Sequence, residues 1–362
     1  MFAMNNKIGI FTWHYYQNFG SALQCFALQS ILESMGEDVK VINYRNPKFG
    51  SVNIFKENIC YILAPILQCV SKRFKLSNLL FRKKYINETR LVRTSEEICE
   101  ISKHFDVIVY GSDQIWAPNL LNTIYLGEHV DSTVRKISYA ASIGLNNIPD
   151  NLLPTYKYLL GSFYKIGIRE QEGKDLIKAK CDMDSTVVLD PTLMLDVQIY
   201  SNMQRKVNGI KQPYLFCYFL NTEHHYKDRV QKYAYKHNLQ IIGVSDKTTD
   251  NEWMTRLTGL GADQFLWLIN HAETIMTDSY HGSIFSLLFH KNFWIFQRFD
   301  EDNPICQNSR IRQLNTYFNL SSRIIYGESI VEESLPIDYE YFESKLNRLR
   351  ASSIDFLRNA LK

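Results

Sequence analysis

The sequence predicts an α/β protein with two domains, each built on a parallel sheet, and a cleft between them. Three observations support this fold class. Short apolar strands alternate with amphipathic helices along most of the chain, which is the pattern of parallel sheets. Several strands end in small or polar residues, as the ligand-facing loops of a doubly wound sheet do. The 362 residues are enough for two domains of ordinary size.

The first predicted domain covers residues 1–195. It opens with a strand at 7–13, a helix at 21–35 and a strand at 38–44, which together form a βαβ unit. Further strands are predicted at 105–110, 136–141, 165–168 and 186–189, with a helix over 170–179. Gly20 stands alone between the first strand and its helix, so a dinucleotide-binding GxGxxG motif is not supported.

The periodicity then lapses, and residues 196–213 are predicted to be a linker. A second α/β domain is predicted over 214–335, followed by a closing helix within 336–362. Its strands are expected at 214–220, 240–245, 274–276 and 293–296, and its helices at 223–237, 263–271, 284–289 and up to residue 318. The alternation of strand and helix again predicts a parallel sheet.

Charge and cysteine content narrow the class of function. Lys+Arg minus Asp+Glu is 41 − 38 = +3, which is too balanced to indicate nucleic-acid binding through bulk charge. The seven cysteines are scattered and include no CxxC pair, which argues against a disulfide framework and against a zinc site. The sequence shows neither a signal peptide nor an apolar run of the roughly 20 residues that span a bilayer. We therefore expect a soluble, cytoplasmic protein.

No metal site is predicted. His224 and His225 lack a third ligand in the sequence around them. The acidic loop Asp300–Asp302 carries oxygen ligands of the kind that Mg²⁺ prefers, but a solvated loop is the simpler interpretation.

Residues 58–85 form an apolar stretch followed by a basic one. The basic part contains Lys72, Arg73, Lys75, Arg82, Lys83 and Lys84, interleaved with apolar residues and without an acidic residue. Such a helix can lie on an anionic membrane surface, here the inner face of the membrane. A solvated helix face is the alternative, and it is the favoured one.

The most informative stretch runs from Glu273 to Phe285, where an apolar strand meets a helix at a polar corner. Either Asp278 or Ser279 is expected to cap the helix. Backbone N–H groups at such a corner favour an anion, and Gly282 allows a backbone or ligand to approach closely. His281 falls in the first turn, where it can act as a general acid or base near neutral pH. A capped helix with a structural histidine is the alternative.

Other strand ends supply further polar residues, namely Asn18, Gly20, Ser112, Asp113, Ser142, Arg169, Glu170 and Asp190. Arg169 and the helix amino terminus at His281 together suit a phosphate or carboxylate. Glu170 is interpreted as a neutralising neighbour of Arg169, and Asp190-Pro191 as a turn.

Six of these pieces, in chain order, resemble the motifs of the polysaccharide pyruvyl transferase family. The pieces are Asn18–Ser21, Gly111–Trp116, Tyr139–Gly144, Ile168–Glu170, Val188–Thr192 and Thr277–Gly282. The resemblance extends from about Lys7 to Arg298, with a further piece at Ser309–Arg312, and it does not cover residues 58–85.

This resemblance implies two Rossmann-like domains in a GT-B-like arrangement, with the active site in the cleft. It implies transfer of a pyruvyl group from phosphoenolpyruvate to two hydroxyls of one sugar, which gives a cyclic ketal and phosphate. The acceptor is then a sugar of a surface polysaccharide or of its lipid-linked precursor. Phosphoenolpyruvate is a co-substrate, and no separate cofactor is implied.

Carried over to this sequence, the resemblance makes His281 the acid/base and Arg169 a contact to the donor's phosphate or carboxylate. The other donor-side residues that it implies are Asp278, Ser279, Gly282, Ser283 and Arg310, and the acceptor-side residues are Asn18, Gly20, Ser112 and Asp113. Stacking on the sugar or packing in the core is expected of Trp13, Tyr15, Tyr16 and Trp116.

Two other readings stay open at this point. The first is a GT-B glycosyltransferase that uses a nucleotide sugar, since a fold does not fix a function. The second is a binding protein or scaffold without catalytic activity. Release of a nucleoside diphosphate would identify the first, and full activity after replacement of His281 would favour the second.

Overall fold

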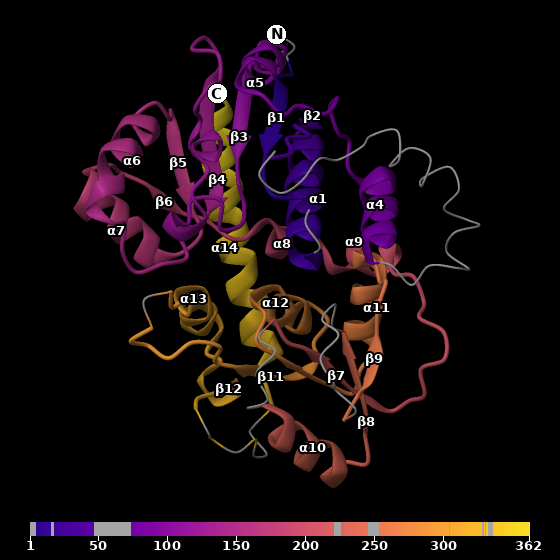
Figure 1. Cartoon of the computed structure of the whole chain (residues 1–362). Coiled ribbons are helices and arrows are strands. Elements are labelled where there is room, and N and C mark those ends of the chain that lie inside the picture. The colour runs from indigo at the N-terminus through magenta and orange to yellow at the C-terminus, as the bar shows by residue number, and fades with distance from the viewer. Residues whose placement is uncertain are drawn as a thin grey trace.

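The computed structural model contains two sheets, which form an upper and a lower half of the molecule (Figure 1). It describes residues 5–15, 18–46, 74–220, 226–244, 253–303, 305–327, 329, 331 and 336–362. Within these residues each sheet has six strands, and every pair of neighbouring strands is parallel. The predicted fold class is therefore confirmed.

The first sheet has the strand order β2-β1-β3-β4-β5-β6. Its strands are β1 (Lys7–Phe11), β2 (Asp38–Val41), β3 (Val107–Tyr110), β4 (Arg135–Ala141), β5 (Lys165–Ile168) and β6 (Thr186–Val187). Its helices are α1 (Phe19–Ser34), α4 (Phe74–Tyr85), α5 (Ser95–Ser102), α6 (Leu153–Leu160) and α7 (Gln171–Cys181). All four residues of β3 are buried, because helices cover both faces of a parallel sheet and leave no polar side.

The second sheet has the order β12-β11-β10-β7-β8-β9. Its strands are β7 (Tyr214–Tyr218), β8 (Gln240–Val244), β9 (Thr255–Leu257), β10 (Thr274–Thr277), β11 (Asn292–Phe296) and β12 (Ile324–Ile325). Its helices are α10 (Lys227–Lys236), α11 (Ala262–His271), α12 (Tyr280–Leu288) and α13 (Ser309–Phe318). Short 3₁₀ turns of the chain lie at Pro118–Leu120, Thr123–Leu126, Asp150–Leu152 and Ser321–Arg323.

Both sheets reverse their strand order once, and the reversals mark the ligand-binding edge. In the first sheet the chain runs from β1 to β2 on one side and then to β3 on the other. In the second sheet it runs from β7 to β8 and β9, and later to β10 on the opposite side of β7. Ligands of open α/β sheets bind at the carboxyl ends of strands beside such switch points. The loops after β1, β3, β7 and β10 therefore lie at the ligand-binding edges of the two sheets.

The two halves share one packed interior. Short helices α8 (Pro191–Met194) and α9 (Val197–Met203) follow the first sheet, and α9 lies within the range predicted as linker. The last helix, α14 (Tyr339–Leu361), runs from the lower half to the upper half (Figure 1). Its Arg350 Nε donates to Leu193 O at 2.7 Å, and its Ser353 Oγ accepts from Leu189 N at 3.0 Å. A single hydrophobic cluster contains buried residues of both sheets and of α14.

Helix α4 corrects part of the prediction for the basic segment. Arg82 is only 3% exposed, and its guanidinium binds Glu88 through Nε at 2.7 Å and Nη2 at 3.0 Å. It therefore contributes no charge to a membrane-facing surface, whereas Lys83 and Lys84 are exposed. Residues 58–73 of the predicted segment lie outside the described residues. No helix of the described chain has the length and apolar character needed to cross a bilayer.

Candidate active site

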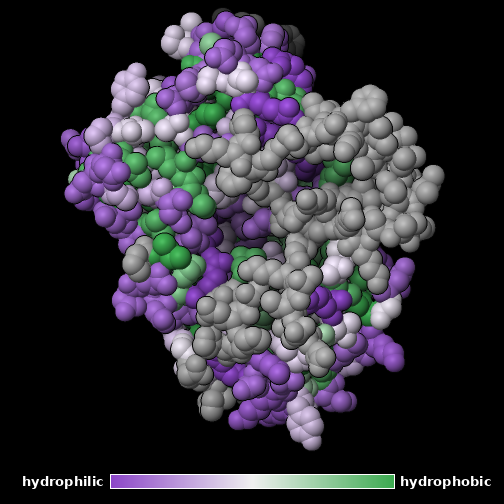
Figure 2. All heavy atoms as spheres, in the orientation of Figure 1, coloured by the Kyte–Doolittle hydropathy of each residue, from purple (hydrophilic) through white to green (hydrophobic). Residues whose placement is uncertain are grey.

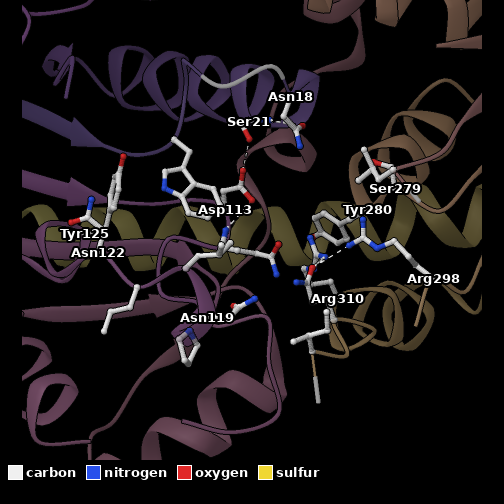
Figure 3. Close-up of a pocket in the computed structure, with 18 of the residues that line it drawn as sticks. Asn18, Ser21, Asp113, Asn119, Asn122, Tyr125, Ser279, Tyr280, Arg298 and Arg310 are labelled. Carbon is white, nitrogen blue, oxygen red and sulfur yellow. Dashed lines mark hydrogen bonds between the residues drawn. The ribbon is translucent and has the colours of Figure 1, made fainter. Parts of the chain in front are cut away.

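A cavity of about 1510 Å³ lies between the two halves, at the switch points of both sheets. Hydrophilic side chains gather in the hollow between the halves (Figure 2). The upper wall comes from the loops after β1 and β3 and from the start of α1 (Figure 3). The lower wall comes from the start of α12 and from residues 298–310. The two walls meet where His281 of the lower half faces the first turn of α1.

The corner between β10 and α12 folds as the sequence predicts, and it settles which residue caps the helix. Ser279 is the N-cap, and its Oγ accepts from Gly282 N at 3.3 Å. Asp278 instead accepts from Leu220 N at 2.7 Å and so joins the ends of β7 and β10. A Cβ atom on Gly282 would lie 2.5 Å from Thr277 Oγ1, so this glycine is needed for the helix to pack against its own strand. The prediction that it serves the approach of a ligand is not supported.

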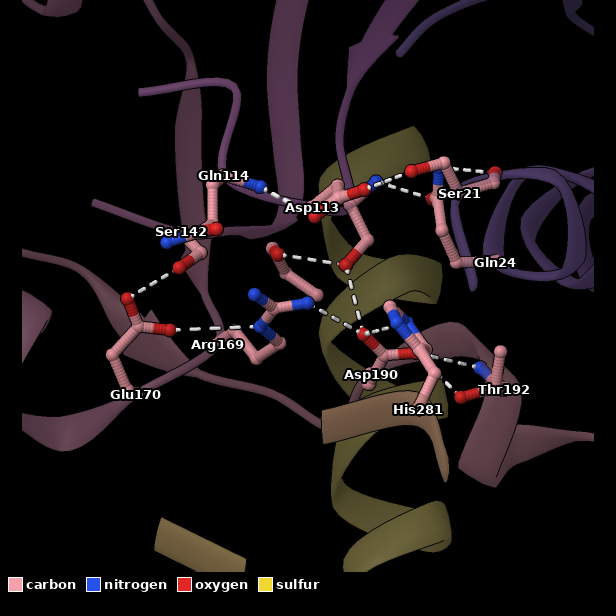
Figure 4. Close-up of polar contacts among 12 residues, drawn as sticks. Ser21, Gln24, Asp113, Gln114, Ser142, Arg169, Glu170, Asp190, Thr192 and His281 are labelled. Carbon is pink, nitrogen blue, oxygen red and sulfur yellow. Dashed lines mark hydrogen bonds and ion pairs between the residues drawn. The ribbon is translucent and has the colours of Figure 1, made fainter. Parts of the chain in front are cut away.

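His281 is held from the other half of the molecule by a carboxylate that sequence reasoning assigned to a turn. Asp190 is 1% exposed, and its Oδ2 lies 3.6 Å from His281 Nε2 (Figure 4). The same oxygen accepts from Arg169 Nη1 at 2.9 Å, and Ser112 Oγ lies 3.2 Å away. Its Oδ1 accepts from Thr192 N at 3.0 Å and from Thr192 Oγ1 at 2.6 Å. The Asp190 carboxylate is thus the hub of the polar network.

The charge state of this hub follows from its neighbours. Burial alone would raise the pKa of Asp190, but the charge and proximity of His281 and the charge of Arg169 outweigh burial. They hold the pKa of Asp190 well below its usual range, because nearby cations favour the ionised carboxylate. Asp190 therefore keeps a negative charge beside the imidazole at neutral pH.

Gly20 at the start of α1 presses against the other side of the same imidazole. A Cβ atom built on Gly20 would lie 2.1 Å from His281 Nδ1 and 2.4 Å from its Cγ. The turn is shaped by Asn18, whose Oδ1 accepts from Gly20 N at 2.9 Å and from Ser21 N at 3.3 Å. His281 lines the cavity, and of its two ring nitrogens Nε2 is the buried one. The nitrogen left for a ligand is Nδ1.

Glu170 does more than neutralise Arg169. Its Oε1 accepts from Ser142 Oγ at 2.7 Å and from the backbone N atoms of Ile143 and Gly144 at 3.1 Å each. Its Oε2 lies 3.6 Å from Arg169 Nε. Glu170 therefore shapes the loop after β4 and also helps to keep the guanidinium of Arg169 in place.

Within the described part of the chain, two arginines of the lower wall lack an anionic partner. Arg298 Nη2 and Arg310 Nη2 donate to the same carboxamide oxygen, Gln307 Oε1, at 3.1 and 2.9 Å. The described part of the chain offers neither of them an ion pair with a carboxylate, and Nε of each is buried without a partner. Burial, and then the like charges of Arg169 and Arg298, lower the pKa of Arg310 to about 9. Uncompensated buried cations at a cavity wall are suited to an anionic ligand.

The ring of Tyr280 lies close to two arginines, one in the cavity wall and one behind it. The guanidinium carbon of Arg169 lies 4.6 Å from the centre of the Tyr280 ring, and that of Arg310 lies 5.7 Å from it. Arg169 is 2% exposed and is not part of the cavity wall, whereas Arg298 and Arg310 are. Arg298 was not predicted as a site residue. Only its position at the end of the family resemblance could have drawn attention to it.

The predicted site residues divide into two groups. Five of them line the cavity: Asn18, Asp113, Ser279, His281 and Arg310. The other six support these from behind: Gly20, Ser112, Arg169, Asp278, Gly282 and Ser283. Ser283 is fully buried, and its Oγ donates to Ser279 O at 3.0 Å, so the predicted contact of its hydroxyl with an anion is not supported.

Sequence reasoning missed two polar side chains that organise the upper wall. Ser21 Oγ donates to Asp113 Oδ2 at 2.6 Å. Gln24 Oε1 accepts from Ser112 N at 3.1 Å, while its Nε2 donates to Trp13 O at 2.9 Å. Both residues lie on α1, one turn apart. The helical period of the sequence after Asn18 could have indicated that they share one face of the helix.

The described residues contain no group of three or more His, Cys, Asp or Glu side chains placed to hold a metal ion. Asp300 of the acidic loop lines the cavity without such companions. His224 and His225 lie outside the described residues, and so does Tyr16.

Comparison with solved structures supports the fold. UDP-GlcNAc 2-epimerase from Methanocaldococcus jannaschii is similar with a TM-score of 0.52 and 12% identity, over 94% of this chain and 92% of that chain. UDP-N-acetylglucosamine 2-epimerase from Rickettsia bellii also has a TM-score of 0.52, with 9% identity over 99% and 97% of the two chains. At such identities the likeness shows the fold alone, which is GT-B-like. Among curated proteins no match is found.

A family model, described as Polysaccharide pyruvyl transferase, matches residues 18–298. These residues include the caps of α1 and α12, the Asp190 hub, and the imidazole that the two halves enclose. The match covers most of the chain, and the chain therefore belongs to the polysaccharide pyruvyl transferase family.

Proposed function

We propose that the enzyme transfers the pyruvyl group of phosphoenolpyruvate to two hydroxyls of one sugar in a surface polysaccharide or its lipid-linked precursor. The observation that carries this proposal is the pair of uncompensated guanidiniums, Arg298 and Arg310, in one cavity with His281. Phosphoenolpyruvate brings a phosphate and a carboxylate, which such groups bind well. The lower wall is then the donor side, and the upper wall is the acceptor side.

The reaction needs proton transfer at two stages. A proton is added to the methylene carbon of phosphoenolpyruvate, and the first sugar hydroxyl bonds to the enol carbon as it loses its own proton. The bond from that carbon to the phosphate oxygen then breaks, and the phosphate leaves with the electron pair. The second hydroxyl bonds to the same carbon, and its proton leaves with the phosphate. The products are a cyclic ketal and inorganic phosphate.

His281 is the group that we assign to these proton transfers. Its Nδ1 faces the cavity while Nε2 lies 3.6 Å from Asp190 Oδ2. A permanent negative charge at this position stabilises the imidazolium whenever the ring holds both protons, as the aspartate of a catalytic triad does. One histidine can therefore act first as an acid and then as a base.

We assign Arg169 a role through Asp190 rather than in direct contact with the donor. Its Nη1 is bound to Asp190, and its side chain is 2% exposed and does not line the cavity. Arg169 keeps the carboxylate charged and fixed in place, and the carboxylate in turn orients the imidazole. The positions that meet the donor are then His281, Arg298 and Arg310.

The test is phosphate release from phosphoenolpyruvate with a panel of galactose-, glucose- and mannose-type acceptors. We expect acceptor-dependent release that His281→Ala abolishes and that Arg310→Ala reduces. His290→Ala is the matched control, because His290 is half-exposed and pairs with Glu343 at 2.8 Å, away from the cavity. Calorimetry supplies the second arm: clear binding of a nucleotide sugar without binding of phosphoenolpyruvate would contradict the proposal.

A further inference from the structure

Two arginines of the lower wall lie at the two ends of one loop. Arg298 follows β11, and Arg310 lies in the first turn of α13. Both line the cavity, and Figure 3 shows them beside Tyr280. After burial and the charge of Arg169, the charge of Arg298 is the next cause that lowers the pKa of Arg310. Two like charges this close repel each other, so another group must hold their guanidiniums together.

Gln307 joins the two guanidiniums. Its Oε1 accepts from Arg298 Nη2 at 3.1 Å and from Arg310 Nη2 at 2.9 Å. A carboxamide oxygen has two lone pairs, so both hydrogen bonds can form at once. The Gln307 side chain itself lines the cavity. One oxygen at the cavity wall therefore sets the spacing between the two cations.

The backbone of the loop supports this bridge. Asn308, next to Gln307, donates through Nδ2 to Phe299 O at 2.8 Å and to Glu301 Oε1 at 3.0 Å. Phe299 directly follows Arg298, so Asn308 ties the two ends of the loop to each other. The bridge through Gln307 is thus built on a backbone that is held on both sides.

The bridging side chain is uncharged, although the same loop contains carboxylates. Glu301 pairs with Arg312 at 2.5 Å. Asp300 lines the cavity, yet among the described residues no carboxylate forms an ion pair with Arg298 or Arg310. A carboxamide aligns the two guanidiniums and leaves both positive charges uncancelled, whereas a carboxylate in the same position would neutralise one of them. Two uncancelled charges suit the double negative charge of a phosphate group.

We infer that Gln307 is a positioning residue for the donor, and that its lack of charge is essential to this role. It holds Arg298 and Arg310 side by side for one phosphate group and leaves the charge of each available. This role rests on the proposed function in taking the two arginines as the partners of phosphoenolpyruvate. Gln307 acts through the arginines and takes no part in the proton transfers.

The first variant adds a charge to the bridge. Calorimetry measures the binding of phosphoenolpyruvate and, separately, of inorganic phosphate to the whole protein, and thermal unfolding is measured without ligand. In Gln307→Glu the dissociation constants of both anions should rise about tenfold or more, because one positive charge is neutralised. Its unfolding temperature should rise by about 2 °C, because the buried arginines gain a carboxylate. A purely structural role would change stability and affinity in the same direction.

The second variant, Gln307→Leu, removes the bridge without adding a charge. The dissociation constants of both anions should rise about three- to tenfold, and the unfolding temperature should not rise. In the phosphate-release assay both variants should raise KM for phosphoenolpyruvate and change kcat much less, because His281 and Asp190 are untouched. Gln198→Glu and Gln198→Leu are the matched controls and should behave as wild type, because Gln198 is exposed on α9, away from the cavity.

Three results would overturn this role: wild type binds neither anion, Gln307→Glu binds both as tightly as wild type, or Gln307→Leu binds them more tightly. The last result would mean that the carboxamide competes with the donor for the arginines. The proposed function is judged separately. The expected pattern with inorganic phosphate, but no release from phosphoenolpyruvate with any acceptor, would sink the proposed reaction and leave Gln307 as the bridge of an anion site. Acceptor-dependent release with an unchanged KM in both Gln307 variants would do the reverse.

Discussion

Gly20→Ala probes the catalytic assignment through sterics alone, because it adds one methyl group and changes no charge. That methyl would lie 2.1 Å from His281 Nδ1, whereas non-bonded heavy atoms prefer about 3.5 Å or more. The imidazole or the first turn of α1 must move by more than about 1 Å to relieve the overlap. The nitrogen concerned is the one that faces the cavity.

Two effects of the substitution on stability oppose each other. Alanine is a better helix former than glycine by about 0.5–1 kcal/mol. Overpacking at a tight contact costs about 1–3 kcal/mol. The fold should therefore survive with a modest loss of stability. Catalysis is more sensitive, because a misplacement of about 1 Å at a reacting group can cost about 100-fold in rate. That factor corresponds to about 2.7 kcal/mol in the activation free energy.

The assay is acceptor-dependent phosphate release from phosphoenolpyruvate, with thermal unfolding of the same preparations. We expect Gly20→Ala to lower kcat about 100-fold while the protein remains folded at assay temperature. Gly161→Ala is the matched control, since Gly161 also follows helical geometry, at the end of α6, and a Cβ there would meet no residue of the site. Wild-type kcat in a folded Gly20→Ala protein would refute the assignment of Nδ1.

Three further predictions follow from the buried charges. Asp190→Asn should lower kcat by about 100- to 10 000-fold and leave phosphoenolpyruvate binding nearly unchanged, as kinetics and calorimetry can show; an equal loss of both would contradict a role through His281. Arg310→Ala should weaken donor binding about 10- to 100-fold in calorimetry. It should not lower the unfolding temperature, because the substitution removes a buried cation that has no carboxylate partner among the described residues. Arg312→Ala is the control and should bind the donor normally, because the Arg312 guanidinium pairs with Glu172 at 2.8 Å. Glu88→Gln should destabilise the protein at pH 7 by about 3–5 kcal/mol in urea unfolding, because it leaves Arg82 buried without its partner. Despite burial, His14 and Arg82 hold the pKa of folded Glu88 well below its usual range. Glu88 of the unfolded chain therefore protonates first, from about pH 4 downward, and the stability difference between wild type and variant should shrink as the pH falls further; a gap that does not change with pH would refute the ion-pair explanation.

Local pattern accounts for the parts of the site that lie within one strand and the helix after it. Ser279 caps α12 and Asn18 caps α1 because short polar side chains that follow an apolar strand can reach the backbone N–H groups two or three residues on. Such contacts depend on a few consecutive residues. The fold class, the two corners and the position of His281 could therefore be predicted from sequence.

The basic segment shows where local pattern misleads. Arg82 has the spacing of a charged surface residue, yet it is buried against Glu88, six positions on. Only the path of the chain around α4 brings the two together. Arg298 likewise appears in the sequence as one more charged loop residue, and its place at the wall depends on how residues 298–310 close the cavity.

By itself the sequence determined the alternation of strands and helices, the corners where the strands end, and the identity of the imidazole. Tertiary structure decided what surrounds that imidazole: Asp190 and Gly20 from the upper half of the molecule lie beside Nε2 and Nδ1 of a residue in the lower half. It also decided that Arg169 supports the site from behind while Arg298 and Arg310 face the cavity. The physical reason is the distance along the chain between the residues that interact. Caps and periodicity are set by neighbours along the chain, whereas burial and charge pairing are set by neighbours in space.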